Sequence, residues 1–180
     1  MNCLAVIIVT IVAISGCQPA KEKEETKEEA PVVIFVDSLA IPDFTMATIA
    51  DSTVFSSSSI PKKGLVLIKY FSPDCDHCQA EAELYFSKKD SLQNIKTIWL
   101  SGAWAELDMI KEFSEKYQLD QLNPIAIGKE PENQLLVHYE ITGTPYSLIY
   151  EDNQLITKYD GDVNFDELIY INNRKLKSER

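Results

Sequence analysis

Length, composition and charge set the first bounds on this chain. Its 180 residues, 45% of them hydrophobic, suffice for one globular domain with a real core but not comfortably for two. The formal net charge of -11, with no clustering of Lys and Arg, argues against a nucleic-acid partner, because phosphate binding needs concentrated positive charge. We therefore expect one domain with appendages.

The N-terminus carries a charge-free apolar stretch that ends at Ile14-Ser15-Gly16-Cys17. The stretch is too short to span a bilayer comfortably and has the length of a signal-peptide core. Its last four residues resemble the bacterial lipobox, in which cleavage precedes a cysteine that then carries the lipid. We expect a signal peptide over residues 1–16, lipidation of Cys17 and a location outside the cytoplasm. The alternative is an N-terminal anchor helix that stays attached.

A charged segment separates Cys17 from the expected domain. Residues 21–29 contain only Lys, Glu and one Thr, so they have no apolar side chain to bury and are expected to form a solvated tether. Residues 31–36 are apolar and extended in character, either as an edge strand or as the entry to the domain. The expected boundaries are thus residues 17–36 for the lipidated cysteine and tether, and residues 37–180 for the globular domain.

Strand and helix patterns alternate through the rest of the chain. Apolar, β-branched and aromatic runs predict strands at residues 65–71, 95–100, 125–127, 146–150 and 155–159, and the last two form a hairpin. Helices are predicted at residues 76–89, 104–117, 134–139 and 165–176. Interleaved strands and helices imply an α/β fold with a mostly parallel sheet that is covered on both faces.

Two of the predicted helices have an apolar face that can be read from the spacing of their residues. The face expected for residues 104–117 consists of Leu107, Ile110, Phe113 and Tyr117. The face expected for residues 76–89 consists of Ala80, Leu84 and Ser87. Both helices should pack these faces against the sheet.

The cysteines limit the kinds of chemistry that the domain can perform. Cys3 would leave with the signal peptide and Cys17 would be lipidated, so only Cys75 and Cys78 remain. Such a pair in an oxidising compartment is either a structural disulfide or a redox centre. A disulfide across so short a loop removes little chain entropy from the unfolded state, so it would stabilise the fold little. The pair follows a predicted strand and opens a predicted helix. The helix N-terminus favours a thiolate at Cys75 and leaves Cys78 as the buried resolving thiol.

The residues around the two cysteines have opposite effects on the thiol pKa. His77 can stabilise a thiolate, whereas Asp74 and Asp76 raise the thiol pKa, so the redox poise does not follow from the motif. A zinc site would need more ligands, and the mature chain offers only His77 and His138, which we interpret as a helix residue. We expect no metal and no cofactor, since no haem, phosphate or nucleotide motif is visible.

Three segments together resemble the TlpA/ResA branch of the thioredoxin-like superfamily, over most of residues 39–172. They are FSPDCDHCQAE from Phe71 to Glu81, GTP from Gly143 to Pro145, and IPDF from Ile41 to Phe44. The resemblance implies a thioredoxin-like fold, with a central mixed sheet flanked by helices and an N-terminal β extension. It also implies a membrane-anchored thiol-disulfide oxidoreductase in cytochrome c maturation or envelope redox homeostasis. Its partners would be disulfide- or dithiol-containing envelope proteins and a membrane electron donor or acceptor.

The resemblance also implies roles for individual residues. Cys75 matches the attacking cysteine, Cys78 the resolving cysteine, and Pro145 a cis-proline that faces them; an ordinary trans proline is the alternative. Glu81 matches an acid that tunes thiol pKa values and relays protons, with a surface glutamate as the alternative. The residues expected beside the substrate are Asp76, His77 and Thr144.

The chain departs from these relatives in two places. Asp74 stands where many carry a tryptophan before the first cysteine, which puts partner recognition in doubt. Glu83 stands where they often carry a helix-kinking proline, which predicts a straighter helix.

Two other functions compete with the oxidoreductase. One is a peroxiredoxin-like peroxidase, since that sister family shares the IPDF opening, but the hydroxyl and arginine that bind peroxide have no match near Cys75. The other is a non-catalytic binding lipoprotein with the same fold. The presence of both cysteines and of the Thr144-Pro145 loop argues against this alternative.

Overall fold

The computed structural model describes residues 39–50 and 53–178. These residues belong to one compact unit, Asp37–Arg180. The expected signal peptide, lipidated Cys17, tether and residues 31–36 lie outside the described residues. Within the described part of the chain, no helix has both the length and the apolar character needed to cross a bilayer.

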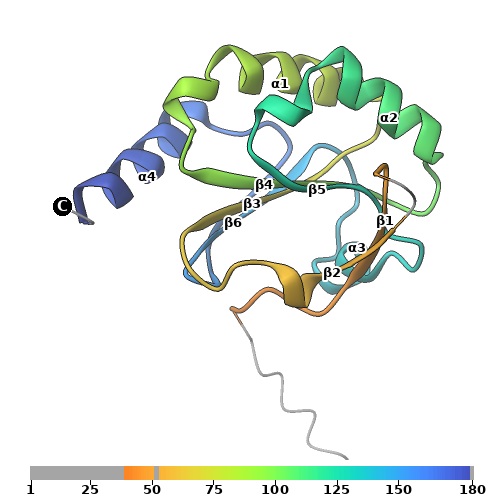
Figure 1. Cartoon of the computed structure of the whole chain (residues 1–180), viewed down its shortest axis with the longest axis horizontal. Helices are drawn as coiled ribbons and strands as arrows, with labels where there is room; N and C mark the ends of the chain where they lie inside the picture. Colours follow the sequence, from red (N-terminus) through yellow and green to blue (C-terminus); the bar gives the residue numbers. More distant parts are fainter. Residues whose placement is uncertain (1–38, 51–52, 179–180) are drawn as a thin grey trace, which may run out of the picture. The chain divides into compact units, whose positions relative to one another are not determined.

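A mixed sheet of seven strands, in the order β2-β1-β5-β4-β3-β6-β7, forms the centre of the domain (Figure 1). Strands β3, β4 and β5 are parallel to one another, and the other pairs are antiparallel. The strands are β1 (Thr45–Thr48), β2 (Val54–Ser56), β3 (Leu65–Tyr70), β4 (Ile95–Ser101), β5 (Pro124–Lys129), β6 (Tyr146–Glu151) and β7 (Gln154–Asp160).

The expectation of a mostly parallel sheet is therefore wrong, because hairpins occupy both edges. The β6–β7 turn places Asp152 and Asn153 at φ 51° and 67°, which suits a tight reversal between antiparallel strands. The β1–β2 hairpin adds the N-terminal β extension at the other edge. The central mixed sheet and N-terminal extension implied by the family resemblance are confirmed.

In the part of the chain that the structure describes, four α-helices lie on the two faces of this sheet. They are α1 (Asp76–Ser87), α2 (Leu107–Lys116), α3 (Gln134–His138) and α4 (Phe165–Ser178). Helices α1, α2 and α4 share one hydrophobic core with the sheet, and α3 packs into a second core on the opposite face (Figure 1). The side chains of β3 divide between the two cores: Leu65 and Leu67 enter the first, and Val66, Ile68 and Tyr70 enter the second.

The predicted face is confirmed for α2 and wrong for α1. Ile110, Phe113 and Tyr117 are buried, with Leu107 packed at the edge of the same core. Helix α1 instead buries Cys78, Glu81, Ala82 and Tyr85, while Leu84 is 46% exposed. The pattern misled because an acid occupies an inward position, where it meets a buried cation. The helix continues through Glu83 without a break.

Candidate functional site

The CxxC pair sits at the start of α1, directly after β3. Cys75 is the N-cap residue, and its Sγ accepts a hydrogen bond from the Cys78 N–H at 3.4 Å. The Cys75 thiol donates to the carbonyl oxygen of Thr144, also at 3.4 Å. Cys75 is partly exposed, Cys78 is fully buried, and both are free thiols. An incoming group can therefore reach Cys75 but not Cys78.

The two thiols differ in acidity as well as in access. Burial acts to raise the pKa of Cys75, but hydrogen bonds with Cys78, Thr144 and the His77 backbone outweigh it and hold that pKa below its ordinary value. Burial raises the pKa of Cys78 to about 12, with a further contribution from its hydrogen bond with Cys75. Cys75 is thus the more acidic thiol of the pair and forms the nucleophilic thiolate more readily than Cys78.

The loop that faces Cys75 comes from the segment before β6. The Thr144-Pro145 peptide bond is cis, as the resemblance implied, and the Thr144 carbonyl points at the Cys75 thiol. Thr144 is partly exposed, whereas Pro145 is buried. Residues about seventy positions apart in the chain are thereby brought together by the pairing of β3 with β6.

A buried ion pair lies on the same face of the sheet as Cys78. Glu81, on α1, is 2% exposed and pairs with Lys69 of β3, which is 0% exposed. Lys69 Nζ also donates to Ser147 Oγ at 3.0 Å, and the Val163 N–H donates to Glu81 Oε1 at 2.8 Å. Glu81 is therefore not a surface glutamate, and every charged atom of the pair is held by a partner from another element.

Lys69 is a site residue that the sequence analysis missed. Burial lowers its pKa, while Glu81 and Cys78 act in the opposite direction through their negative charge. A signal was present, since a lysine stood inside the apolar run of residues 65–71, and a lysine is almost never fully buried without a partner. Its partner could not be identified until α1 was placed on the sheet.

The two residues between the cysteines lie in solvent. Asp76 and His77 are exposed, and His77 Nδ1 lies 3.5 Å from Oδ1 of Asp162, which is also exposed. The imidazole thus has an acidic neighbour outside the motif, and it is the backbone of His77 that acts on Cys75. The expected substrate contacts of Asp76, His77 and Thr144 stay predictions.

A groove of about 480 Å³ opens beside Cys75. Its walls come from the end of β3 and the segment that leads to α1, from the loop between β4 and α2, from α3 and from the loop before the cis-proline. The described residues that line it include Tyr70, Asp74, Cys75, Trp104, Leu136, Ile141 and Thr144. We call this space the Cys75 groove.

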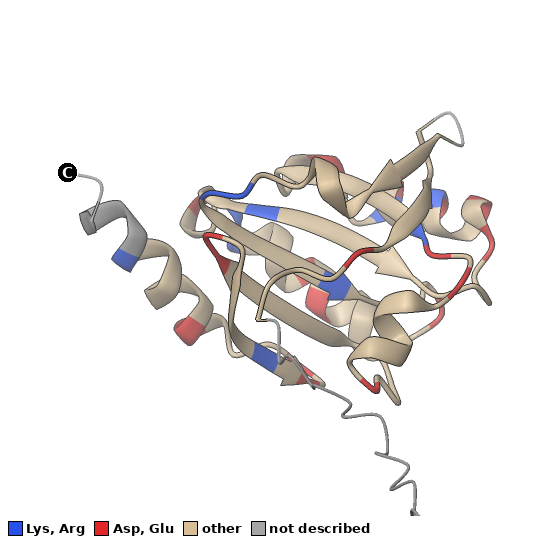
Figure 2. Cartoon of the chain, turned by 90° about the horizontal axis from the view of Figure 1, so that it is seen from below, with Lys and Arg blue, Asp and Glu red and all other residues tan. Residues whose placement is uncertain are grey.

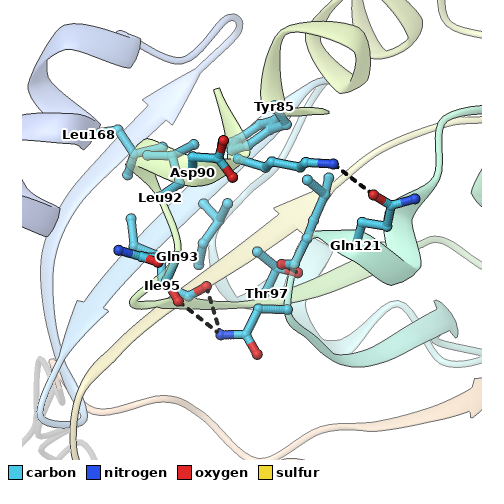
Figure 3. Close-up of a pocket in the computed structure, with 12 residues that line it drawn as sticks. Tyr85, Asp90, Leu92, Gln93, Ile95, Thr97, Gln121 and Leu168 are labelled. Atoms are coloured by element: carbon cyan, nitrogen blue, oxygen red, sulfur yellow. Dashed lines mark hydrogen bonds between the residues drawn. The ribbon is translucent and has the colours of Figure 1, made fainter. Parts of the chain in front are cut away.

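A separate cavity of about 210 Å³ lies where β4 begins (Figure 3). Apolar side chains such as Tyr85, Leu92, Ile95 and Leu168 form much of its wall, and Gln121 accepts a hydrogen bond from Lys89 at its rim. Because β3 and β4 are parallel, this cavity lies at the end of the sheet opposite Cys75. It does not contribute to the CxxC site.

The positions of the potential metal ligands and of the arginines bear on the metal and peroxidase alternatives. No group of three or more His, Cys, Asp and Glu side chains among the described residues could hold a metal ion. His138 is exposed and its ring stacks edge-on against Tyr139 at 4.6 Å. Of the two arginines, Arg174 pairs with Glu151, and Arg180 lies outside the described residues. In the view of Figure 2, Lys and Arg are scattered among Asp and Glu and form no basic stripe.

Solved structures resemble this domain closely enough to fix its fold. One is a secreted disulfide oxidoreductase of Mycobacterium tuberculosis that is homologous to DsbE of E. coli. It is 17% identical, with a TM-score of 0.60 over 77% of this chain and 98% of that one. The fold is thioredoxin-like.

Two further structures support the same assignment. StoA from Bacillus subtilis is 20% identical, with a TM-score of 0.53 over 73% of this chain and 97% of its own. The thioredoxin domain of a Bacteroides vulgatus thiol-disulfide oxidoreductase is 14% identical, with a TM-score of 0.57 over 76% and 94%. No protein-family model and no curated protein matches the sequence. The thioredoxin-like fold expected from the CxxC and cis-proline segments is thus confirmed.

Proposed function

We propose that this chain is a thiol-disulfide oxidoreductase that exchanges disulfides with envelope proteins through Cys75 and Cys78. The observation that carries the proposal is the division of labour within the pair. Cys75 is reachable and has a lowered pKa, whereas Cys78 is buried with a pKa of about 12. A structural staple would need no such difference, while a nucleophile and a resolving thiol do.

The first chemical step joins the client to the protein. The Cys75 thiolate attacks one sulfur of a client disulfide, so that the client S–S bond breaks and a mixed disulfide with Cys75 forms. The other client sulfur leaves as a thiolate and takes a proton from water. The N–H of Cys78, which already points at Cys75 Sγ, stabilises the attacking thiolate.

The second step releases the client. The Cys78 sulfur attacks Cys75 Sγ, so that the Cys75–client S–S bond breaks and the Cys75–Cys78 S–S bond forms. The client sulfur leaves as a thiolate, and the proton released by Cys78 balances the one that this thiolate takes up. The client has then gained two electrons, and the reverse sequence donates a disulfide. Burial makes the Cys78 thiolate costly, and the positive charge of Lys69, which is paired with Glu81, offsets part of that cost.

A reversible redox titration of the purified full-length chain tests this function. Equilibration with graded glutathione and dithiothreitol buffers, followed by quantitation of free thiols, should give a single two-electron transition. The Cys78→Ser variant should instead trap a mixed disulfide with its substrate, and Cys75→Ser should trap none. A pair that does not titrate reversibly would favour a non-catalytic binding lipoprotein.

The cellular setting is part of the same proposal. We place the domain at the membrane surface, anchored through lipid on Cys17 and facing the periplasm or the outside, with a membrane electron donor or acceptor. Cytochrome c maturation and envelope redox homeostasis are the processes that fit the family resemblance. Fractionation tests the anchor: Cys17→Ser should move the protein from the membrane to the soluble fraction, whereas the control Cys3→Ser should leave it at the membrane.

A further inference from the structure

An aromatic side chain forms one wall of the Cys75 groove although it belongs to a distant part of the sequence. Trp104, in the loop between β4 and α2, lines the groove together with Cys75. Half of its surface, 50%, is exposed. A large apolar side chain left in solvent beside a reactive thiol calls for an explanation, because aromatic residues at exposed, well-packed positions often anchor partners.

The loop that carries Trp104 is fixed on both sides. The Ala105 N–H closes a turn onto the Gly102 carbonyl at 3.2 Å. The Ala103 N–H donates to Asn133 Oδ1 at 2.8 Å, and Lys129 Nζ donates to the Ala105 carbonyl at 2.7 Å. These bonds tie the loop to β5 and to the residue before α3, so the backbone around Trp104 is ordered before any partner arrives.

The indole ring itself is also positioned. A Cβ placed on Gly102 would lie 2.0 Å from Trp104 Cζ3, so the ring rests directly on the glycine backbone. The ring also meets Tyr70, with ring centroids 5.9 Å apart and planes at 60°. Only a glycine leaves room for this placement. Trp104 is therefore held in one orientation while half of it stays open to the groove.

We propose that Trp104 is the docking platform for a large apolar side chain that flanks the reacting cysteine of a client polypeptide. The inference rests on the proposed function and names the substrate feature that the same site selects. A preordered aromatic surface gives binding energy without a new ordering cost. Here it supplies an aromatic contact at a site where Asp74, rather than a tryptophan, precedes Cys75.

The rest of the groove is consistent with this client. Leu136 and Ile141 add apolar surface, and among the described lining residues Asp74 is the only charged one. An acidic client residue would meet repulsion from Asp74, and no cation is among the described residues that line the groove to offset it. The preferred client segment therefore carries an aromatic or large aliphatic residue beside its cysteine and no acid there.

Competing peptide substrates test the proposal. The substrates are short peptides whose single cysteine forms a mixed disulfide with glutathione, and the residue next to that cysteine is Phe, Ser or Asp. The full-length dithiol protein reduces each peptide, and the second-order rate constants are measured. We expect the Phe peptide to react roughly three- to tenfold faster than the Ser peptide, the size of one aromatic contact. The Asp peptide should react slowest.

Matched variants separate docking from chemistry. The preference is expressed as the ratio of the Phe-peptide to the Ser-peptide rate constant within each variant. Trp104→Ala should bring this ratio close to one, while Trp104→Phe should retain most of it. Gly102→Ala, which displaces the ring without removing it, should also weaken the preference. Tyr170→Ala is the control, since Tyr170 is an exposed aromatic on α4 outside the groove.

The outcomes distinguish the two proposals. A Phe preference that is lost in Trp104→Ala and kept in Tyr170→Ala supports the docking platform. An unchanged preference in Trp104→Ala, or no preference in the wild type despite normal reaction with oxidised glutathione, overturns the platform alone. If the wild type reduces neither the peptides nor oxidised glutathione, the oxidoreductase function fails and the docking inference fails with it.

Discussion

Two successive residues of β3 send their side chains to opposite faces of the sheet, and each meets a buried glutamate. Lys69 pairs with Glu81 on the face covered by α1. The Tyr70 hydroxyl donates to Glu130 Oε1 at 3.2 Å on the other face. Both acids are almost completely inaccessible to solvent. The two clusters therefore solve the same desolvation problem with different partners.

The partners decide what each acid can do. Glu130 also accepts the N–H groups of Leu135 and Leu136, so neutral donors surround it and fix the start of α3 beside the Cys75 groove. Glu81 has a cation as its main partner, and that cation also acts on Cys78. The face that carries Cys78 therefore has a charged pair that acts electrostatically on the thiol. The acid on the opposite face, Glu130, is held by neutral donors and has a structural role.

The largest expected effect follows from breaking the ion pair. Lys69→Met leaves Glu81 as an uncompensated buried charge, which typically costs about 3–5 kcal/mol in the free energy of unfolding. Urea denaturation of the dithiol form measures it. A loss below about 1 kcal/mol would contradict the pairing seen here.

A double variant separates stability from chemistry at the same pair. Lys69→Met with Glu81→Met replaces two buried charges by apolar side chains and should recover part of the lost stability. Its resolving step should stay slow, because no cation remains to stabilise the Cys78 thiolate. Stopped-flow release of client from a Cys75 mixed disulfide measures that step. Recovery of a wild-type rate would show that the pair serves the fold alone.

Glu130→Gln should have a smaller effect, on stability and its pH dependence. The amide nitrogen that replaces one oxygen leaves a buried donor unsatisfied, at about 1–3 kcal/mol. Burial raises the pKa of Glu130, while the N–H groups of Leu135 and Leu136 oppose the shift. The folded state then holds its proton at a pH where the unfolded chain has released it.

The sign of the pH effect follows from that difference. The folded state binds more protons, so wild-type stability falls as the pH rises from the ordinary glutamate pKa through the raised folded-state value. The Gln variant lacks this decline, which denaturation curves across acidic pH can test. The reduction potential of Cys75 and Cys78 should be the same in both proteins, and a shifted potential would mean that the two faces are coupled.

Tyr70→Phe tests the Glu130 cluster with a smaller expected loss of stability. It removes one neutral donor to Glu130 and keeps the ring against Trp104, so we expect a loss of about 1 kcal/mol. The pKa of Glu130 should rise further, because the hydrogen bond from the phenol lowers it. A double-mutant cycle with Glu130→Gln isolates the pair. A coupling energy near zero would contradict the hydrogen bond.

Much of the fold could be predicted because local patterns agreed with the final packing. The apolar run over residues 65–71 became the central strand, and the turn at Asp152 and Asn153 gave the β6–β7 hairpin. Strand direction could not be predicted from interleaved elements, since it depends on where a hairpin docks. The β1–β2 hairpin pairs with β5, a contact between residues that are distant in the chain.

The candidate site was predictable wherever chemistry follows from spacing. Cys75 and Cys78 are three positions apart at the start of one helix, so their shared location needed no tertiary information. Lys69 and Trp104 could not be found this way. Each acquires its meaning from a partner that the fold supplies: Glu81 for the lysine, and Gly102 and the groove for the tryptophan.

The smallest expected effect concerns His77, the residue that the motif itself singles out. Its side chain lies in solvent near Asp162, and exposed charge pairs contribute about 0–1 kcal/mol. The Cys75 pKa depends instead on hydrogen bonds with Cys78, Thr144 and the His77 backbone, which His77→Ala retains. Thiolate absorbance during a pH titration should therefore give nearly the same Cys75 pKa in wild type and variant, with Cys75→Ser as the blank. A clear upward shift in His77→Ala would show that the imidazole stabilises the thiolate, and control of the site would then be shared between the buried ion pair and the exposed motif.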